Sequence, residues 1–416
     1  MLKRTFIYYN IAMSSFLTCD QTVAEIKIKD WFYNGTKQLF VLSGYAGTGK
    51  TTLLKRVVLD SLKLVPGESA AFVTPTGKAA TVLIKSGVEA CTLHRLIYQS
   101  HTELVDIVLN GKSVKVEKLL FKRRESIDKK IKLIILDEAS MVSDDVLLDV
   151  MRYGVKILLC GDMAQLPPVD GENTFLQNPD ATLKKIVRQQ ENNPIITLAQ
   201  MAREGVPIRY GNYGDKVFVL NKWDFVGERR KRLMLKAGQI ICGTNKTRTQ
   251  INDEIRSYLG FGDMPQSGEK LICTQNNWEQ FIDEDFTFNM VNGIIGYAHD
   301  PAYDVAKGIG FMQFKPEFLD GFCPSVLPFD TGIFSDGRYH YKHGDYFEKF
   351  DENGEAVGAF TLNRFEFGYC ISCHKAQGSE FDTAIVFDES YAFKEDKNRW
   401  LYTAITRAKN KLIIIR

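Results

Sequence analysis

Short apolar runs in the first half of the chain are each followed by a loop rich in glycine, hydroxyl or carboxylate side chains. The runs are 39–42, 70–73, 131–136 and 155–160. Apolar runs of this length, bounded by turn residues, are typical of buried strands. After the first run, apolar residues recur at helical spacing from Leu53 to Val58. Buried strands that alternate with helices predict an α/β fold built on parallel sheets.

The pattern changes to that of antiparallel strands in two stretches. Residues 105–109 and 112–116 flank Asn110-Gly111, which is the strongest short signal of a β-hairpin. Residues 112–132 carry nine Lys/Arg against three Asp/Glu, which fits either a solvated hairpin or a finger that faces nucleic acid. From about 286 to 365, aromatic residues, Asn-Gly turns and short alternating runs predict a small β-rich unit. Between 302 and 331 the pattern predicts no particular element.

Composition narrows the class of protein without identifying it. At 416 residues the chain exceeds one ordinary core, so two or more domains are expected. The content of 44% hydrophobic and 25% charged residues is that of a globular protein, and a net charge of +2 means that any basic surface must be local. Eight cysteines without a small-domain framework favour a reducing compartment.

The first residues faintly imitate a signal peptide, but Tyr8, Tyr9 and Asn10 interrupt their apolar run. No apolar run approaches the length of a membrane span. We therefore expect a cytoplasmic protein, in the host cytoplasm if the source is viral, and no membrane partner. Met1 and Met13 both remain possible translation starts.

Residues 43–51 form a glycine-rich turn between the first predicted strand and helix. Gly44 to Thr51 spells G-x-x-x-x-G-K-T, the phosphate-loop pattern, in the strand–loop–helix context that this motif requires. Glycines let backbone N–H groups converge on phosphate oxygens, and the positive end of the helix points at the same place. Lys50 is expected to reach the β- and γ-phosphates of ATP, and the Thr51 hydroxyl to bind Mg²⁺. The predicted nucleotide contacts are Gly44, Ala46, Gly47, Thr48, Gly49, Lys50, Thr51 and Thr52.

Two carboxylates end the third apolar run. Asp137 is expected to hold Mg²⁺ through water or Thr51, and Glu138 to polarise the attacking water. This pair favours hydrolysis over nucleotide binding alone. Gln165, beyond the fourth run, could sense the γ-phosphate by hydrogen bonding, and Arg188 is a candidate for the cation that stabilises the transition state. On its own, an arginine at this position is more often a surface charge.

Other polar residues on the loops of the first half have two interpretations. Thr76 either caps the following helix or contacts a phosphate, and a lone histidine such as His94 is usually structural. The amide of Gln21 offers the adjacent donor and acceptor that adenine requires, although a glutamine there is on its own expected at the surface.

The motifs occur in the order found in superfamily 1 helicases, and the chain resembles their RecD/Dda-like branch. The resemblance rests on Gln21 and on GYAGTGKT, VTPTGKAA, TLH, ILDEAS, GDMAQLPPV, VRQ, HKAQGSEFD and YTAITRA. It implies two RecA-like domains with ATP between them. Domain 1A would span 1–204, with a basic β-hairpin 1B inserted at about 99–132. Domain 2A would span 205–416, with an SH3-like β-barrel 2B inserted at about 286–365.

The resemblance also implies roles for individual residues. Gln21 would contact adenine, and Gly378 and Glu380 would contact the nucleotide sugar. Gln165 would couple the γ-phosphate to motion, while Arg188 and Arg407 would reach that phosphate from the domain interface. The residues expected to contact DNA are Thr74, Pro75, Thr76, Thr92, His94, Thr244, Asn245, Arg248 and His374, with Asn110 and Lys112 on the hairpin that would split the duplex.

Cys370 to His374 matches the C-x-x-C-H pattern of c-type haem attachment. The pattern overlaps the HKAQGSEFD motif, and a cytoplasmic chain is not supplied with c-type haem, so we reject this interpretation. A zinc site is rejected as well, because no second cysteine pair or histidine cluster completes four ligands.

The sequence thus predicts an ATP-dependent, Mg²⁺-requiring DNA helicase that moves 5′→3′ on single-stranded DNA. Its expected partners are single strands and ss/ds junctions, with replication or recombination proteins as further candidates, and we expect it to work as a monomer. Three alternatives remain open: a DNA translocase or remodeller that separates strands poorly, a nucleotide-gated DNA-binding recombination protein, and an RNA helicase.

Overall fold

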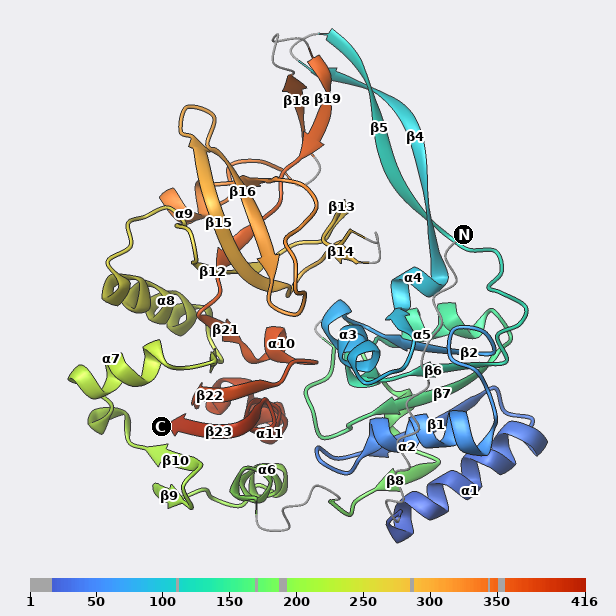
Figure 1. Cartoon of the computed structure of the whole chain (residues 1–416). Helices are drawn as coiled ribbons and strands as arrows, with labels where there is room; N and C mark the ends of the chain where they lie inside the picture. The colour runs from blue at the N-terminus through green and yellow to red at the C-terminus, as the bar shows by residue number, and fades with distance from the viewer. Residues whose placement is uncertain are drawn as a thin grey trace.

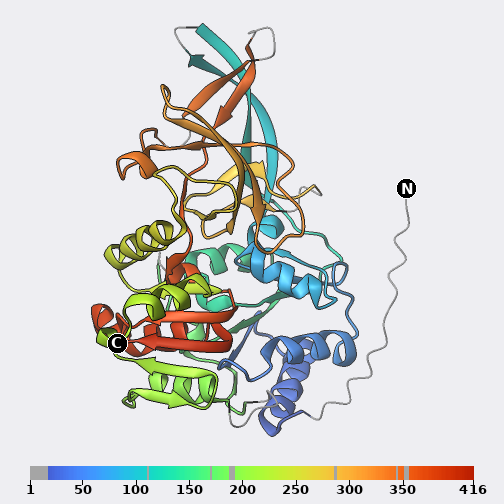
Figure 2. The same ribbon diagram turned by 60° about the vertical axis from the view of Figure 1, so that its left-hand side comes forward.

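The computed structural model describes residues 17–109, 112–168, 171–186, 193–284, 288–342, 345–350 and 356–416. Two α/β domains lie side by side, and a β-rich region with a long hairpin covers one end of both (Figures 1 and 2). Among the described residues, no helix is long and apolar enough to cross a membrane.

The first domain is built on a six-stranded parallel sheet. Its strands, in spatial order, are β3 (Ala90–Thr92), β2 (Ala70–Thr74), β6 (Leu133–Leu136), β7 (Lys156–Gly161), β1 (Leu39–Gly44) and β8 (Ala181–Leu183). The four apolar runs form its central strands and are almost wholly buried, because helices cover both faces of the sheet. The helices are α1 (Cys19–Asn34), α2 (Lys50–Arg56), α3 (Gly77–Lys85), α4 (Leu93–Ile97) and α5 (Asp144–Met151).

The second domain has a similar sheet with one antiparallel edge. Its strands, in spatial order, are β21 (Cys370–Ser372), β11 (Gln239–Cys242), β22 (Phe381–Phe387), β23 (Ala408–Ile415), β10 (Val217–Leu220) and β9 (Gly211–Tyr213). Only β9 runs antiparallel to its neighbour. The helices are α6 (Pro194–Glu204), α7 (Gly227–Leu235), α8 (Asn245–Leu259), α10 (Cys373–Ala376) and α11 (Lys397–Ile405).

The proline and glycine residues between 194 and 214 suggest a hinge between the two domains, but the first half of this stretch is helical. Residues 194–204 form α6, which packs against α11 of the second domain. Asn193 caps this helix through its side chain, Pro194 occupies the first turn, and Gly205 ends the helix at a φ of 71°. Pro and Gly therefore mark the two ends of a helix here and not a linker.

A five-stranded antiparallel sheet forms most of the β-rich region between residues 270 and 367. Its strands, in spatial order, are β17 (Leu327–Asp330), β16 (Ile309–Pro316), β15 (Ile295–Asp304), β12 (Lys270–Cys273) and β20 (Phe365–Phe367). Phe314, Phe329 and Phe365 are fully buried, so these aromatic residues form the core of the insert. The sheet includes much of 302–331, for which the sequence predicted no particular element.

Three hairpins and a short helix complete this end of the molecule. The two-stranded ladders are β13 (Asn277–Phe281) with β14 (Asn289–Met290), β18 (Tyr346–Phe350) with β19 (Ala356–Thr361), and β4 (Tyr98–Leu109) with β5 (Lys112–Arg123), and the helix is α9 (Gly332–Ser335). The predicted hairpin is therefore present in the first domain, with strands more than twice as long as expected. Its outer part lies beside β18 and β19 (Figure 1).

Candidate active site

The predicted phosphate loop joins β1 to α2 at the carboxyl edge of the first sheet. Gly47 and Gly49 have φ values of 78° and 74°, which residues with a Cβ rarely adopt. A Cβ on Gly44 would lie only 2.9 Å from the Lys50 side chain and from the Thr48 hydroxyl. All three glycines are therefore required by the geometry of the loop.

Lys50 folds back over this loop. Its ammonium donates hydrogen bonds to the carbonyl oxygens of Gly44, at 2.7 Å, and Tyr45, at 3.2 Å. Burial alone would lower the pKa of Lys50, but the carboxylates of Asp162, Glu138 and Asp137 outweigh it and the pKa is raised. Lys50 is therefore held charged, beside the place where phosphates are expected.

The structure brings Thr51, Asp137 and Glu138 together opposite the loop. The Thr51 hydroxyl donates a 3.0 Å hydrogen bond to Asp137 Oδ2. A hydroxyl and a carboxylate are oxygen ligands of the kind that Mg²⁺ prefers, so this pair fits the predicted metal contact. Glu138 has a left-handed backbone, with φ 56° and ψ 36°, which is a strained geometry of the kind that clusters at active sites.

Glu138 also has a perturbed acidity. Burial raises its pKa, the neighbouring Asp137 raises it further, and the charges of Arg407 and Lys50 lower it. Arg407 belongs to the second domain, so a cation of that domain lies near enough to Glu138 to influence its pKa. A carboxylate near the phosphate loop is suited to orient a water molecule for attack on a phosphate.

Arg407 is 4% exposed and is fixed by its own domain. Its guanidinium donates hydrogen bonds of 3.1 Å to the carbonyl oxygens of Thr403 and Ser379 and to the Thr406 hydroxyl. Within the described ranges no carboxylate lies within ion-pair distance of Arg407. A rigid cation with neutral partners retains its charge for an anion at the interface.

Tyr402 and Asp162 connect the domains, and sequence reasoning did not select either. The Tyr402 hydroxyl donates a 2.6 Å hydrogen bond to Asp162 Oδ2 and accepts a 2.8 Å bond from the backbone N–H of Ala46 in the phosphate loop. Arg203 of α6 stacks 3.7 Å from the centre of the Tyr45 ring. Asp162 lies in the motif GDMAQLPPV and Tyr402 in the motif YTAITRA, but neither motif indicates that the two side chains are in contact.

Gln165 is 6% exposed, and its Oε1 has no hydrogen-bond partner. The nearby backbone is fixed across the interface, because Leu166 N donates to Thr403 Oγ1 at 2.9 Å and Leu166 O accepts from Gln377 Nε2 at 2.8 Å. A buried, unpaired amide oxygen next to the interface between the two domains is consistent with the predicted hydrogen bond of Gln165 at the γ-phosphate.

The other predicted nucleotide contacts are placed less directly. Gln21 is 4% exposed, so the surface interpretation is wrong; its Nε2 donates to Thr48 O of the phosphate loop at 3.0 Å. Its Oε1 accepts from Thr18 N in the capping box of α1. A methyl group on Gly378 would lie 3.4 Å from Thr76 Oγ1, so Gly378 faces the first domain. Glu380 is exposed. Thr52 is exposed on α2. The adenine and sugar contacts stay predictions.

Three predicted residues cannot be placed in the site. Arg188 and Asn110 lie outside the described residues, and only the backbone of Lys112 is described, at the start of β5.

Most of the predicted DNA contacts of the first domain make hydrogen bonds within their own loops. The Thr74 hydroxyl is buried and donates to Thr76 O at 2.9 Å, while Thr76 and Thr92 cap α3 and α4 through their side chains. Pro75 is half-buried between them. His94 is exposed, with its ring 5.5 Å from that of Tyr98 and 5.0 Å from that of Trp278 in the insert. The capping interpretation of Thr76 is confirmed, and the DNA contacts stay predictions.

In the second domain, a carboxylate binds the loop that carries the predicted DNA contacts Thr244 and Asn245. Glu389 accepts hydrogen bonds of 2.8 Å from the backbone N–H groups of Gly243 and Thr244. It also accepts from the hydroxyls of Thr244, at 3.0 Å, and Thr247, at 2.5 Å. The amino end of α8 is thereby satisfied within the protein, so Thr244 is not free to bind a phosphate in this structure.

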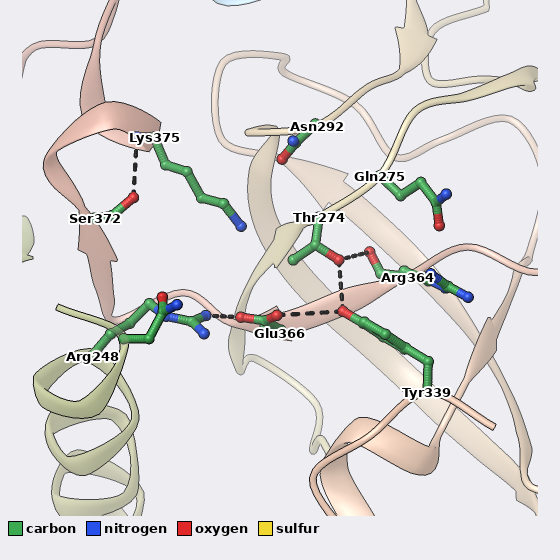
Figure 3. A pocket seen from close by; sticks show the side chains of 10 residues that line it. Arg248, Thr274, Gln275, Asn292, Tyr339, Arg364, Glu366, Ser372 and Lys375 are labelled. Carbon is green, nitrogen blue, oxygen red and sulfur yellow. Dashed lines mark hydrogen bonds and ion pairs between the residues drawn. The ribbon is translucent and has the colours of Figure 1, made fainter. Parts of the chain in front are cut away.

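Arg248, on the first turns of α8, pairs with Glu366 (Figure 3), while Asn245 is exposed. His374 lies 5.8 Å from the Phe393 ring, and burial lowers its pKa. Cys370 and Cys373 are fully buried, and no group of three or more His, Cys, Asp or Glu side chains in the described ranges is arranged to hold a metal.

The chain matches known families over most of its length. Residues 30–220 match the AAA domain family, and residues 367–415 match the UvrD-like helicase C-terminal domain family. The chain is 32% identical over 430 residues to the ATP-dependent DNA helicase dda of Enterobacteria phage T4, with 90% of this chain and 93% of that protein covered. It is 27% identical over 403 residues to the ATP-dependent RecD2 DNA helicase of Deinococcus radiodurans, with 90% of this chain but 46% of the relative covered. The chain thus spans about half the length of the RecD2 relative.

Solved Pif1 helicases have a similar fold. A Pif1 structure that concerns DNA unwinding at forked duplexes gives a TM-score of 0.51 at 18% identity, covering 96% of this chain and 92% of that one. Bacteroides Pif1 bound to single-stranded DNA gives a TM-score of 0.50 at 20% identity, with the same coverage. The two parallel sheets described above are therefore the two RecA-like domains of this fold.

Proposed function

Because the chain belongs to the superfamily 1 DNA helicases of the RecD/Pif1/Dda type, we propose that it hydrolyses ATP to move 5′→3′ along single-stranded DNA and to separate duplex DNA. The observation that carries the proposal is the position of Arg407. This buried cation of the second domain acts on Glu138 of the first, beside the phosphate loop. A nucleotide site completed by two domains makes hydrolysis depend on their closure.

The residues divide the chemical work as follows. The phosphate-loop N–H groups and Lys50 bind the phosphates, Glu138 orients the water and accepts its proton, and Arg407 stabilises the charge that develops in the transition state. Thr51 and Asp137 would hold Mg²⁺, which would supply positive charge to neutralise the phosphates. Closure on ATP and reopening after hydrolysis shift the two domains relative to each other along the strand.

The hairpin β4–β5 is the proposed wedge. Its base is fixed to the first domain, because Arg123 pairs with Asp149 at 2.6 Å and the Tyr153 hydroxyl bonds to Ile97 O and Arg124 O. A two-stranded hairpin that is fixed at its base and extends beyond the two α/β sheets (Figure 1) is suited to block one strand of a fork. Because α6 packs on α11 of the second domain, the proposed domain limits move from 1–204 and 205–416 to about 1–193 and 194–416. The hairpin is proposed at about 99–132 and an SH3-like insert at about 286–365.

The proposed partners follow from the same family. The solved Pif1 structures concern unwinding at forked duplex DNA and binding to single-stranded DNA, and we propose the same substrates for this chain. We also propose that it works as a monomer.

Steady-state ATP hydrolysis with and without oligo-dT tests the proposal. We expect stimulation by the oligonucleotide, and Lys50→Ala should abolish both rates because it removes the phosphate contact. Hydrolysis that is indifferent to DNA would contradict the motor and would favour a nucleotide-gated DNA-binding protein.

A further inference from the structure

Helix α7 and the segment before it, residues 222–226, lie on the outer side of the second domain. Figure 1 shows α7 on the side that faces away from the first domain, with α8 between it and the β insert. This surface is therefore remote from the phosphate loop and from the β4–β5 hairpin.

One side of α7 is fixed to the rest of its domain. Arg230 makes a bidentate ion pair with Glu254 of α8, in which both N–O distances are 2.6 Å. Phe225 and Met234 are buried in the core that α7 shares with α8 and the sheet. The helix is thereby held in one orientation, and its other side forms a preorganised surface.

The other side of α7 carries three exposed cations, Arg229, Arg232 and Lys236. Their spacing of i, i+3 and i+7 places them in one stripe along the helix. In the described part of the chain no carboxylate lies within ion-pair distance of any of the three. At the rise of a helix the stripe is about 10 Å long, which about three residues of an extended peptide would span.

Large apolar side chains are exposed next to this stripe in the sequence. Trp223 is 74% exposed, Val226, at the start of α7, is 58% exposed, and Leu235, at its end, is 39% exposed. The Lys222 ammonium lies 4.8 Å from the centre of the Trp223 ring. Single exposed apolar residues are common, but an exposed tryptophan together with unpaired arginines matches the residue types enriched at the centre of protein interfaces.

Two exposed carboxylates in the same segment, Asp224 and Glu228, decide between the possible anionic partners. A nucleic acid carries a negative charge at every nucleotide, so these carboxylates repel it. A peptide can place its acidic residues opposite the cations and neutral residues opposite Asp224 and Glu228. Val226 and Leu235 have no hydrogen-bonding group for a nucleotide, but they can pack against apolar side chains of a peptide. The surface therefore suits a peptide better than a nucleic acid.

We propose that the exposed side of α7, together with Trp223, is a docking surface for an acidic peptide segment of a partner protein that also carries aromatic or aliphatic side chains. The acidic groups of the segment pair with the stripe of cations, and its apolar side chains cover Trp223 and Val226. The docking surface is separate from the nucleotide site, so the partner would attach to the enzyme without blocking the motor.

Fluorescence anisotropy of a labelled peptide that repeats Asp-Asp-Phe, titrated with the full chain, tests this surface. Arg232→Gln removes the central cation of the stripe, so the affinity should fall about two- to fivefold, as expected for one exposed ion pair. Trp223→Ala should lower the affinity roughly tenfold, because a tryptophan at the centre of an interface contributes strongly. Arg399→Gln is the matched control, because it changes an exposed arginine of α11 in the same domain, and it should leave the affinity unchanged.

Two altered peptides separate the contribution of charge from that of apolar contact. A repeat of Asn-Asn-Phe lacks the charge and a repeat of Asp-Asp-Gly lacks the rings, so both should bind more weakly than the original. Glu228→Gln removes a carboxylate from the surface, so it should bind the acidic peptide more tightly.

Equal peptide affinity for wild type and Arg232→Gln would overturn the inference, as would equal binding of the Asn-Asn-Phe repeat or a wild-type chain that does not bind the acidic peptide. A loss of oligo-dT affinity in Arg232→Gln that exceeds its loss of peptide affinity would also overturn it and would assign the surface to nucleic acid. ATP hydrolysis stimulated by oligo-dT should be the same in wild type and Arg232→Gln. Failure of the docking inference would therefore leave the proposed function intact.

Discussion

Replacing Tyr402 with phenylalanine tests how the two domains control the phosphate loop. In the structure the Tyr402 hydroxyl accepts a 2.8 Å hydrogen bond from the backbone N–H of Ala46. The same hydroxyl donates a 2.6 Å hydrogen bond to Asp162. Backbone N–H groups of this loop are the expected ligands of ATP phosphates. Phosphate and Tyr402 therefore compete for the same donor, and nucleotide binding must first break this contact between the domains.

The expected change in nucleotide affinity follows from the free energy of the hydrogen bond between Tyr402 and Ala46. Tyr402 is 2% exposed, and phenylalanine fits the same space, so the change removes the hydroxyl and little else. A buried neutral hydrogen bond contributes a net free energy of about 0.5–1.5 kcal/mol. Without it, nucleotide should bind about 2- to 12-fold more tightly. Asp162 loses a donor at the same time, so the midpoint of thermal unfolding should fall.

Equilibrium titration with a fluorescent ATP analogue measures the dissociation constant directly. Tyr391→Phe is the matched control, because Tyr391 is a 71% exposed tyrosine of the same domain. We expect the dissociation constant to fall in Tyr402→Phe and to stay unchanged in Tyr391→Phe. An unchanged or higher value in Tyr402→Phe would refute the reasoning, because Ala46 N–H would then not be a phosphate ligand.

Three further predictions follow from other residues. Arg407→Ala should leave ATP affinity nearly intact but lower kcat by ~10³-fold or more, whereas Arg399→Ala, on the exposed face of α11, should change kcat less than about twofold; lost affinity at an unchanged kcat would contradict this role. Glu389→Ala leaves four hydrogen-bond donors at the start of α8 without their acceptor. The free energy of unfolding should fall by about 2–3 kcal/mol and the thermal midpoint by roughly 4–12 °C. An unchanged midpoint in a thermal melt would contradict this prediction. Burial and the like charge of Arg248 lower the pKa of Lys375 to about 8. A DNA phosphate bound beside these two cations would raise it, so oligo-dT affinity should be constant below pH 8 and fall as pH rises above 8, while Lys375→Arg should remove this fall; a parallel fall in the arginine variant would assign it to another group.

The sequence predicted those parts of the site that a local motif encodes. Gly47, Gly49 and Lys50 follow from one loop whose backbone only glycine adopts, and Asp137 with Glu138 follows from the end of a buried strand. The β4–β5 hairpin followed from the Asn-Gly signal, although its full length did not, because the alternation is weak beyond residues 105–116.

Contacts between distant segments could not be predicted. Tyr402 and Asp162 are 240 positions apart, and the carboxylate that satisfies α8 comes from Glu389, which no helix-capping pattern near Thr244 includes. Likewise α6 packs on α11, which lies about two hundred positions later in the chain. Without that contact in view, the proline and glycine at the two ends of α6 resemble those of a linker. Such pairs depend on how the two sheets are placed, which local periodicity does not encode.

Unwinding of duplexes that carry a single-stranded tail tests the central claim most directly. Two substrates with the same duplex, one with a 5′ oligo-dT tail and one with a 3′ tail, are incubated with the full chain, ATP and Mg²⁺. The account predicts strand separation from the 5′ tail alone, and its loss in Arg407→Ala. Unwinding from the 3′ tail would contradict the direction of movement, and ATP hydrolysis stimulated by DNA without strand separation from either tail would contradict the wedge.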